Sequence, residues 1–133
     1  MYKTGVTLSR RTAIVIIVDC STSMKKYTMF NGMRIVKAEA AEFITNMIID
    51  ELYERAIRFD VTRYYYDIAI IGFSGDGTYS KLPGIHDFVP IYNFTDFEPQ
   101  PKTYNFDQTL NDGRCIKVPF VIRPWIKAEA HGT

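Results

Sequence analysis

Two short segments of the chain are almost wholly apolar and rich in β-branched residues. Residues 12–19 have the sequence TAIVIIVD, and residues 66–73 have the sequence YDIAIIGF. A strand that is apolar on both faces is typical of the centre of a parallel or mixed sheet in an α/β protein. We therefore expect strands at 12–19 and 66–73, the first of them buried on both faces.

Between these two strands, apolar residues recur at intervals of three and four. This spacing predicts an amphipathic helix over residues 32–57, with most charged side chains on the opposite face. The apolar positions are Met33, Val36, Ala40, Phe43, Ile44, Met47, Ile48 and Leu52. Asn31 precedes them and is a residue type favoured at a helix N-cap. The order strand, helix, strand predicts a right-handed βαβ unit.

The rest of the chain contains several short sequences that favour turns. The sequence SGDG at 74–77 predicts a turn, with a short antiparallel return strand at 78–82. Residues 83–122 form an aromatic-rich insertion, which we expect to be irregular, with short helical turns, as far as residue 108. The sequence NDG at 111–113 is a turn signal between residues 104–110 and 114–122, which could form a hairpin.

Composition and charge narrow the classes of function. The 133 residues include 16 basic and 15 acidic side chains, a net charge of +1, which argues against nucleic-acid binding through a bulk basic surplus. No apolar run approaches the roughly 20 residues of a membrane span, and the run at 13–18 is too short for a signal-peptide core. Cys20 and Cys115 lack metal-finger or CxxC spacing, which favours free thiols in the reducing cytoplasm.

The candidate chemistry lies directly after the first predicted strand. Asp19, Ser21 and Ser23 place three hard oxygen donors at the carboxyl end of that strand, where functional groups gather in α/β sheets. Hard oxygens suit Mg²⁺, Mn²⁺ or Ca²⁺ better than zinc or copper. One carboxylate and two neutral hydroxyls leave such an ion under-neutralised, so it still attracts an anionic oxygen from a partner. The alternative is that these side chains only satisfy a turn.

The motif Asp19-x-Ser21-x-Ser23, between a hydrophobic strand and an amphipathic helix, resembles the metal-ion-dependent adhesion site (MIDAS) of von Willebrand factor A (vWA) domains. The resemblance implies a doubly wound, Rossmann-like α/β sheet with helices on both faces. It implies that the two serines contact the metal directly and that the aspartate supports it through water. It also implies a threonine on a second loop, which is Thr133 or the residue after it, and an aspartate on a third loop, which has no recognisable counterpart here.

In the light of this resemblance, residues 1–133 are expected to be a partial vWA domain that stops after the second loop of the metal site. The strand at 12–19 then becomes an apolar sheet edge, which invites self-association. The implied function is non-enzymatic, metal-assisted binding of a protein ligand through its Glu or Asp carboxylate, with no nucleic acid and no membrane involved. The chain looks most like the stand-alone intracellular bacterial A domains of the tellurite-resistance (TerY-like) kind.

Two other functions stay open at this point. One is a metal-free interaction scaffold of the same fold. The other is a phosphatase-like enzyme with Asp19 as nucleophile, which is disfavoured because such enzymes need a second carboxylate two residues on, where this chain has Ser21. The sequence also lacks a GxxxxGK[ST] loop and a GxSxG elbow.

Several other residues have ordinary interpretations. Asp76 is expected to be a solvated turn residue, and His86 and His131 are expected to be surface histidines without ligand partners. The sequence Arg123-Pro124-Trp125 has two interpretations: it anchors a partner, or Trp125 packs onto the sheet.

Overall fold

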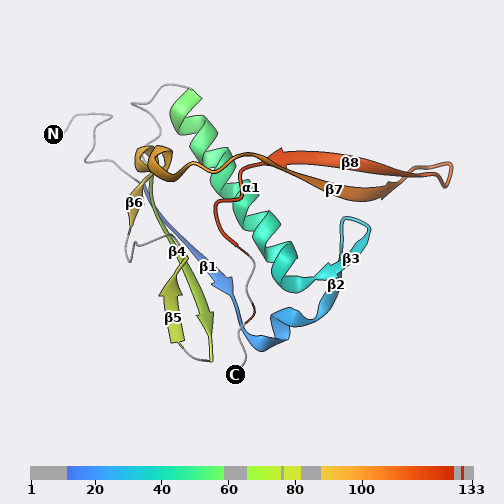
Figure 1. Cartoon of the computed structure of the whole chain (residues 1–133), viewed down its shortest axis with the longest axis horizontal. Coiled ribbons are helices and arrows are strands. Elements are labelled where there is room, and N and C mark those ends of the chain that lie inside the picture. The colour runs from blue at the N-terminus through green and yellow to red at the C-terminus, as the bar shows by residue number, and fades with distance from the viewer. Residues whose placement is uncertain (1–11, 59–65, 76, 82–87, 128–129, 131–133) are drawn as a thin grey trace.

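The computed structural model describes residues 12–58, 66–75, 77–81, 88–127 and 130 (Figure 1). These residues form a mixed α/β structure in which one sheet contains β1 (Thr12–Asp19), β4 (Tyr66–Ser74), β5 (Gly77–Ser80) and β6 (Val89–Pro90). β1 runs parallel to β4, whereas β5 and β6 run antiparallel to β4. The strands predicted at 12–19 and 66–73 and the antiparallel return strand are therefore confirmed.

β1 lies at an edge of this sheet, in the order β1-β4-β5. Its side chains alternate: Ile14, Ile16 and Val18 join the core, whereas Val15 is 47% exposed and Ile17 is 65% exposed. The prediction that β1 is buried on both faces is therefore wrong. The prediction of an apolar edge is confirmed, because β4 is the one strand that pairs with β1 within the described ranges.

The long helix α1 (Lys37–Arg58) begins later than the predicted start at residue 32. The residues before it form a hairpin of β2 (Tyr27–Phe30) and β3 (Met33–Val36). Asn31 and Gly32 connect the two strands with φ angles of 52° and 79°, the left-handed conformations that a type I′ hairpin turn requires. The prediction of Asn31 as a helix N-cap is wrong, because the Asn-Gly pair directs a hairpin turn instead.

The aromatic-rich insertion is more regular than predicted. After β6 come the 3₁₀ helix η3 (Ile91–Phe97) and the strands β7 (Lys102–Thr109) and β8 (Cys115–Ile122), which pair antiparallel. The hairpin turn predicted at 111–113 is confirmed. The pairing of these strands agrees with the hairpin expected between 104–110 and 114–122, whereas the expectation of irregular structure is wrong from residue 102 onward. The β7–β8 hairpin projects from α1 on the side away from the sheet (Figure 1).

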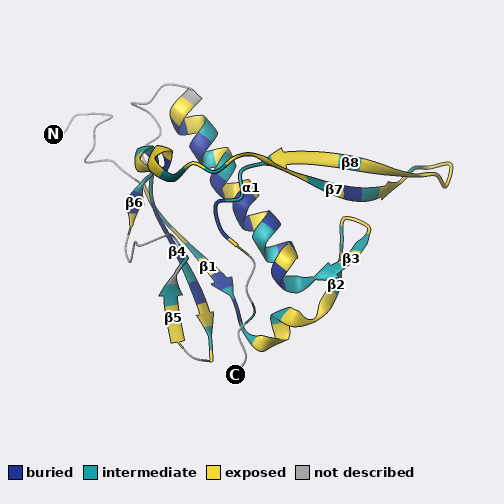
Figure 2. Cartoon of the chain, viewed as in Figure 1, coloured by how far each residue is buried: buried dark blue, intermediate teal, exposed yellow. Residues whose placement is uncertain are grey.

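Two groups of aromatic side chains pack along α1, where Figure 2 shows a line of buried residues. One group joins α1 to η3 and to the segment after β8, and consists of Tyr53, Phe94, Phe97 and Trp125. The other joins α1 to the two hairpins, and consists of Phe30, Phe43, Tyr104, Phe106 and Phe120. Trp125 therefore packs inside the molecule, against α1 and η3, and is not an exposed anchor.

A pair of hydrogen bonds fixes the segment after β8 onto α1. The buried Asn46 side chain accepts a hydrogen bond from the Ile126 backbone N–H at 2.8 Å and donates one to the Ile126 carbonyl at 3.1 Å. Both thiols are free, as predicted, with Cys20 buried and Cys115 exposed. Among the helices of the described residues, none has the length and apolar character needed to cross a membrane.

Candidate functional site

The loop from Asp19 to Ser23 leaves β1 at its carboxyl end and continues into η2 (Thr22–Lys25), a short 3₁₀ helix. The Cys20 backbone N–H donates to the Phe73 carbonyl at 2.8 Å, so the chain stays attached to β4 one residue beyond β1. Ser21 is half-buried and Ser23 is exposed. The sheet therefore presents the start of the loop at a fixed place, and its hydroxyls are accessible to an incoming group.

The three predicted residues do come together in this loop. The Ser21 backbone N–H donates to Asp19 Oδ1 at 2.8 Å, and the Ser21 and Ser23 Oγ atoms lie 3.0 Å apart. Two adjacent oxygen ligands of an octahedral Mg²⁺ ion, each about 2.0–2.1 Å from the metal, are separated by about 2.8–3.0 Å. The two hydroxyl oxygens are therefore spaced as two ligands of such an ion would be. All three side chains also offer the hard oxygen atoms that such an ion prefers.

The surroundings of Asp19 favour its ionised form. Its pKa is lowered by the hydrogen bond from the Ser21 backbone N–H and, to a smaller extent, by a hydrogen bond from the Ser21 side chain. The positive charge of Lys37 acts in the same direction, and the slight burial of Asp19 opposes it. The loop thus carries a carboxylate anion beside two neutral hydroxyls at neutral pH.

Thr133, the predicted ligand on a second loop, lies outside the described residues, as do Asp76, His86 and His131. In the part of the chain that the structure describes, no three His, Cys, Asp or Glu side chains gather where they could hold a metal.

The sequence interpretation missed the β2–β3 hairpin, which follows the loop directly. The Lys37 backbone N–H donates to the Lys26 carbonyl at 2.8 Å and closes the base of this hairpin. The hairpin therefore places Lys25, Lys26 and Arg34 on the chain immediately after the candidate ligands. The signal that would have revealed it is the Asn31-Gly32 pair.

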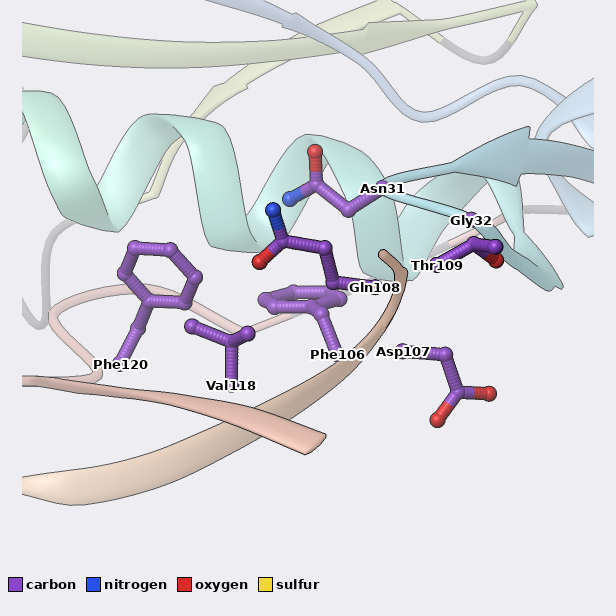
Figure 3. A pocket seen from close by; sticks show the side chains of 8 residues that line it. All are labelled: Asn31, Gly32, Phe106, Asp107, Gln108, Thr109, Val118 and Phe120. Carbon is purple, nitrogen blue, oxygen red and sulfur yellow. The ribbon is translucent and has the colours of Figure 1, made fainter. Parts of the chain in front are cut away.

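A separate cavity of about 480 Å³ lies between the β2–β3 turn and the β7–β8 hairpin. It is lined by Asn31, Gly32, Phe106, Asp107, Gln108, Thr109, Val118 and Phe120. Figure 3 shows Phe106, Val118 and Phe120 side by side, with the Asp107 carboxylate pointing away from them. That carboxylate pairs with Lys117 at 2.6 Å, so the cavity wall is mainly apolar and offers no evident reactive group.

Comparisons with protein-family models, curated protein sequences and solved structures find no match to this chain.

Proposed function

We propose that this chain is a non-enzymatic protein-interaction domain of the von Willebrand factor A type, built on a doubly wound fold. In this proposal Asp19, Ser21 and Ser23 hold a divalent cation, Mg²⁺ or else Mn²⁺ or Ca²⁺, and Thr133 is a further candidate ligand. The cation supplies a positive charge to which a Glu or Asp carboxylate of the partner protein binds. The observation that carries the proposal is the 3.0 Å separation of the Ser21 and Ser23 hydroxyl oxygens.

The residues of the loop have distinct parts in this function. The Asp19 carboxylate accepts a hydrogen bond from the Ser21 backbone N–H and so fixes the turn that brings the two hydroxyls together. Ser21 and Ser23 provide neutral ligands, which leave most of the positive charge of the ion uncompensated. Because Ser23 is exposed, a carboxylate from outside can approach this side of the loop.

A metal-free interaction scaffold of the same fold is the second candidate. Two observations favour it. The Ser21 and Ser23 hydroxyls form a hydrogen bond with each other, and Asp19 Oδ1 already accepts a hydrogen bond from the Ser21 backbone N–H, so the loop satisfies these groups without a metal. The phosphatase-like alternative is weaker, because Asp19 is engaged by its own loop and Ser21 occupies the place of the general acid.

A thermal-shift titration separates the metal-dependent function from the metal-free scaffold. We expect Mg²⁺ or Mn²⁺ to raise the melting temperature, because an ion that binds the folded state alone stabilises it by about 2.7 kcal/mol at one hundred times its Kd. The double variant S21A/S23A should lose this shift. Thr22→Ala, which removes a hydroxyl from the same loop outside the motif, should keep it.

Two results of this titration contradict the metal proposal. One is a melting temperature that does not respond to Mg²⁺, Mn²⁺ or Ca²⁺. The other is an equal rise in the wild type and in S21A/S23A, which would place the ion elsewhere.

We also propose that a second copy of the chain pairs along the open edge of β1. Residues 13–18 carry no charge, and an antiparallel pair centred on Ile16 sets Val15 opposite Ile17 and Ile14 opposite Val18. These central cross-strand pairs are apolar, which stabilises such a sheet, and Ala13 lies opposite Asp19 at each end. Light scattering after size exclusion should give twice the mass of one chain, and Ile17→Lys should shift the protein to the monomer.

The control for this experiment is Ile116→Lys, which places the same charge at an exposed position of β8. It should leave the mass unchanged. A wild-type protein that is monomeric at every concentration would contradict pairing through β1.

A further inference from the structure

Positive charge is concentrated in the segment that follows the Asp19 loop. Between Asp19 and Glu39 the sequence has four basic side chains and no acidic one, a local charge of +4; they are Lys25, Lys26, Arg34 and Lys37. Because the whole chain has a net charge of +1, the remaining residues together carry 1 − 4 = −3. The near-neutral total therefore conceals a strongly basic region beside the candidate metal site.

The two faces of the β2–β3 hairpin differ in their surroundings. On one face, Phe30 packs edge-on against Phe43 and Phe106, with ring centroids 5.8 and 5.5 Å apart, so this face points into the molecule. Met29 pairs with Arg34 on the other face, together with Tyr27. Tyr27 is 54% exposed and Met29 is 67% exposed, so this second face is open to solvent.

The open face combines the Arg34 cation with large apolar side chains, and two further cations precede it on the chain. The Arg34 guanidinium lies 4.1 Å from the centre of the Tyr27 ring, and the exposed Lys25 and Lys26 lie just before β2. Among the described residues, no carboxylate forms an ion pair with Lys25, Lys26 or Arg34. Tyr, Met and Arg are the residue types enriched at protein interfaces.

We propose that this face binds an acidic segment of a partner protein, in which apolar side chains alternate with carboxylates. The carboxylates match Lys25, Lys26 and Arg34, and the apolar side chains match Tyr27 and Met29. Because the hairpin continues directly from the Asp19–Ser23 loop, a segment lying on it can extend one further carboxylate toward that loop. This last contact rests on the proposed function, whereas the charge attraction by the hairpin operates without a metal.

The same features favour a protein partner over a nucleic acid. Arg34 already covers one face of the Tyr27 ring, which removes a surface on which a base would stack. Met29 offers an apolar contact without the flat π surface that bases prefer. The charge of −3 on the rest of the chain also repels a long polyanion beyond the hairpin.

The experiment measures fluorescence anisotropy of a labelled peptide of alternating Glu and Leu residues at low ionic strength, in EDTA and in Mg²⁺. We expect the wild type to bind in EDTA and to bind more tightly in Mg²⁺. K25E/K26E should weaken binding in EDTA by roughly tenfold or more, because two attractive charges become repulsive. R114E/K117E, which changes the net charge equally on the β7–β8 hairpin, should bind as the wild type does.

The outcomes distinguish this inference from the metal function. S21A/S23A should keep the binding seen in EDTA and lose the gain from Mg²⁺. If Mg²⁺ does not change the affinity of the wild type for the peptide while K25E/K26E still weakens binding, the metal function is contradicted and the proposed binding surface on the hairpin is supported. The inference is overturned if the wild type does not bind the peptide in EDTA, if K25E/K26E binds as the wild type does, or if labelled oligothymidine binds more tightly.

Discussion

Replacement of Trp125 with alanine should lower the free energy of unfolding by roughly 3–5 kcal/mol, as is usual for a large buried aromatic side chain. Trp125 is 5% exposed, and its ring centroid lies 4.9 Å from that of Tyr53 and 5.4 Å from that of Phe94. The substitution leaves a cavity where the segment after β8 joins α1 and η3. Urea denaturation followed by circular dichroism measures the loss.

Trp125→Phe separates the packing of this ring from its hydrogen bond. The indole Nε1–H donates to Asp50 Oδ1 at 3.1 Å, and phenylalanine keeps most of the apolar contact while losing this donor. We expect it to cost about 2 kcal/mol. Val121→Ala, at a position on β8 that is 63% exposed, should change stability by less than about 0.5 kcal/mol. A loss for Trp125→Ala as small as that for Val121→Ala would contradict the packing.

The strands of the sheet were predictable because their signal is local and strong. The apolar runs at 12–19 and 66–73 form β1 and β4 at nearly the expected bounds. Whether a face of β1 is covered depends on segments far away in sequence, which the run itself does not specify. Val15 and Ile17 show this limit, since the same β-branched residues suit a central strand and an exposed edge equally well.

The start of α1 was mispredicted because two local signals compete there. Met33 and Val36 continue the three- and four-residue spacing of the helix, but they also lie on a short strand after an Asn-Gly turn. The left-handed backbone of Asn31 and Gly32 determines the outcome. The turn also lies close to β7, where a Cβ atom on Gly32 would come within 2.7 Å of the Asp107 carbonyl oxygen. This tertiary contact reinforces the turn and has no counterpart in the local sequence.

The candidate site was predictable for the same reason as the strands. Asp19, Ser21 and Ser23 are two residues apart, so a single loop suffices to bring them together. The cluster around Arg123 is different, because it joins residues that are 25 to 73 positions apart. No sequence motif among these residues predicts the cluster. It forms only because the folded chain brings the segment after β8 across α1.

In this cluster one guanidinium pairs with three carboxylates. Arg123 Nη1 lies 2.9 Å from Asp50 Oδ1 and 2.8 Å from Glu54 Oε2, and Arg123 Nε lies 2.9 Å from Glu98 Oε2. Burial alone would lower the pKa of Arg123, but its hydrogen bonds to these carboxylates raise it above its usual value. The arginine is therefore charged at any pH at which the protein is folded, and it holds α1 to the segments on either side of the β7–β8 hairpin.

Hydrogen bonds from the Tyr53 hydroxyl and from Arg123 lower the pKa of Glu98 below its ordinary 4.5, the Tyr53 bond contributing more. The Tyr53 hydroxyl donates to Glu98 Oε1 at 2.7 Å. A carboxyl whose pKa is lowered in the folded state adds stability above its unfolded-state pKa, and this stability is lost as the pH falls through the folded-state value. The contribution of Glu98 to stability should thus weaken only in acid, below about pH 4.5.

Arg123→Met should lower the free energy of unfolding at pH 7 by roughly 3–5 kcal/mol, because it leaves three carboxylates together without their cation. Without the cation the three carboxylates repel one another, and this repulsion decreases in acid, where carboxylates lose their charge. The difference in stability between the variant and the wild type should therefore be smaller at pH 4 than at pH 7. Urea denaturation at pH 7 and pH 4 measures both effects. The control Arg55→Met breaks an exposed pair with Glu51 on the same helix and should cost no more than about 0.5 kcal/mol. If Arg123→Met costs the same at both pH values, the loss arises from packing of the arginine side chain, and unbalanced charge is not its cause.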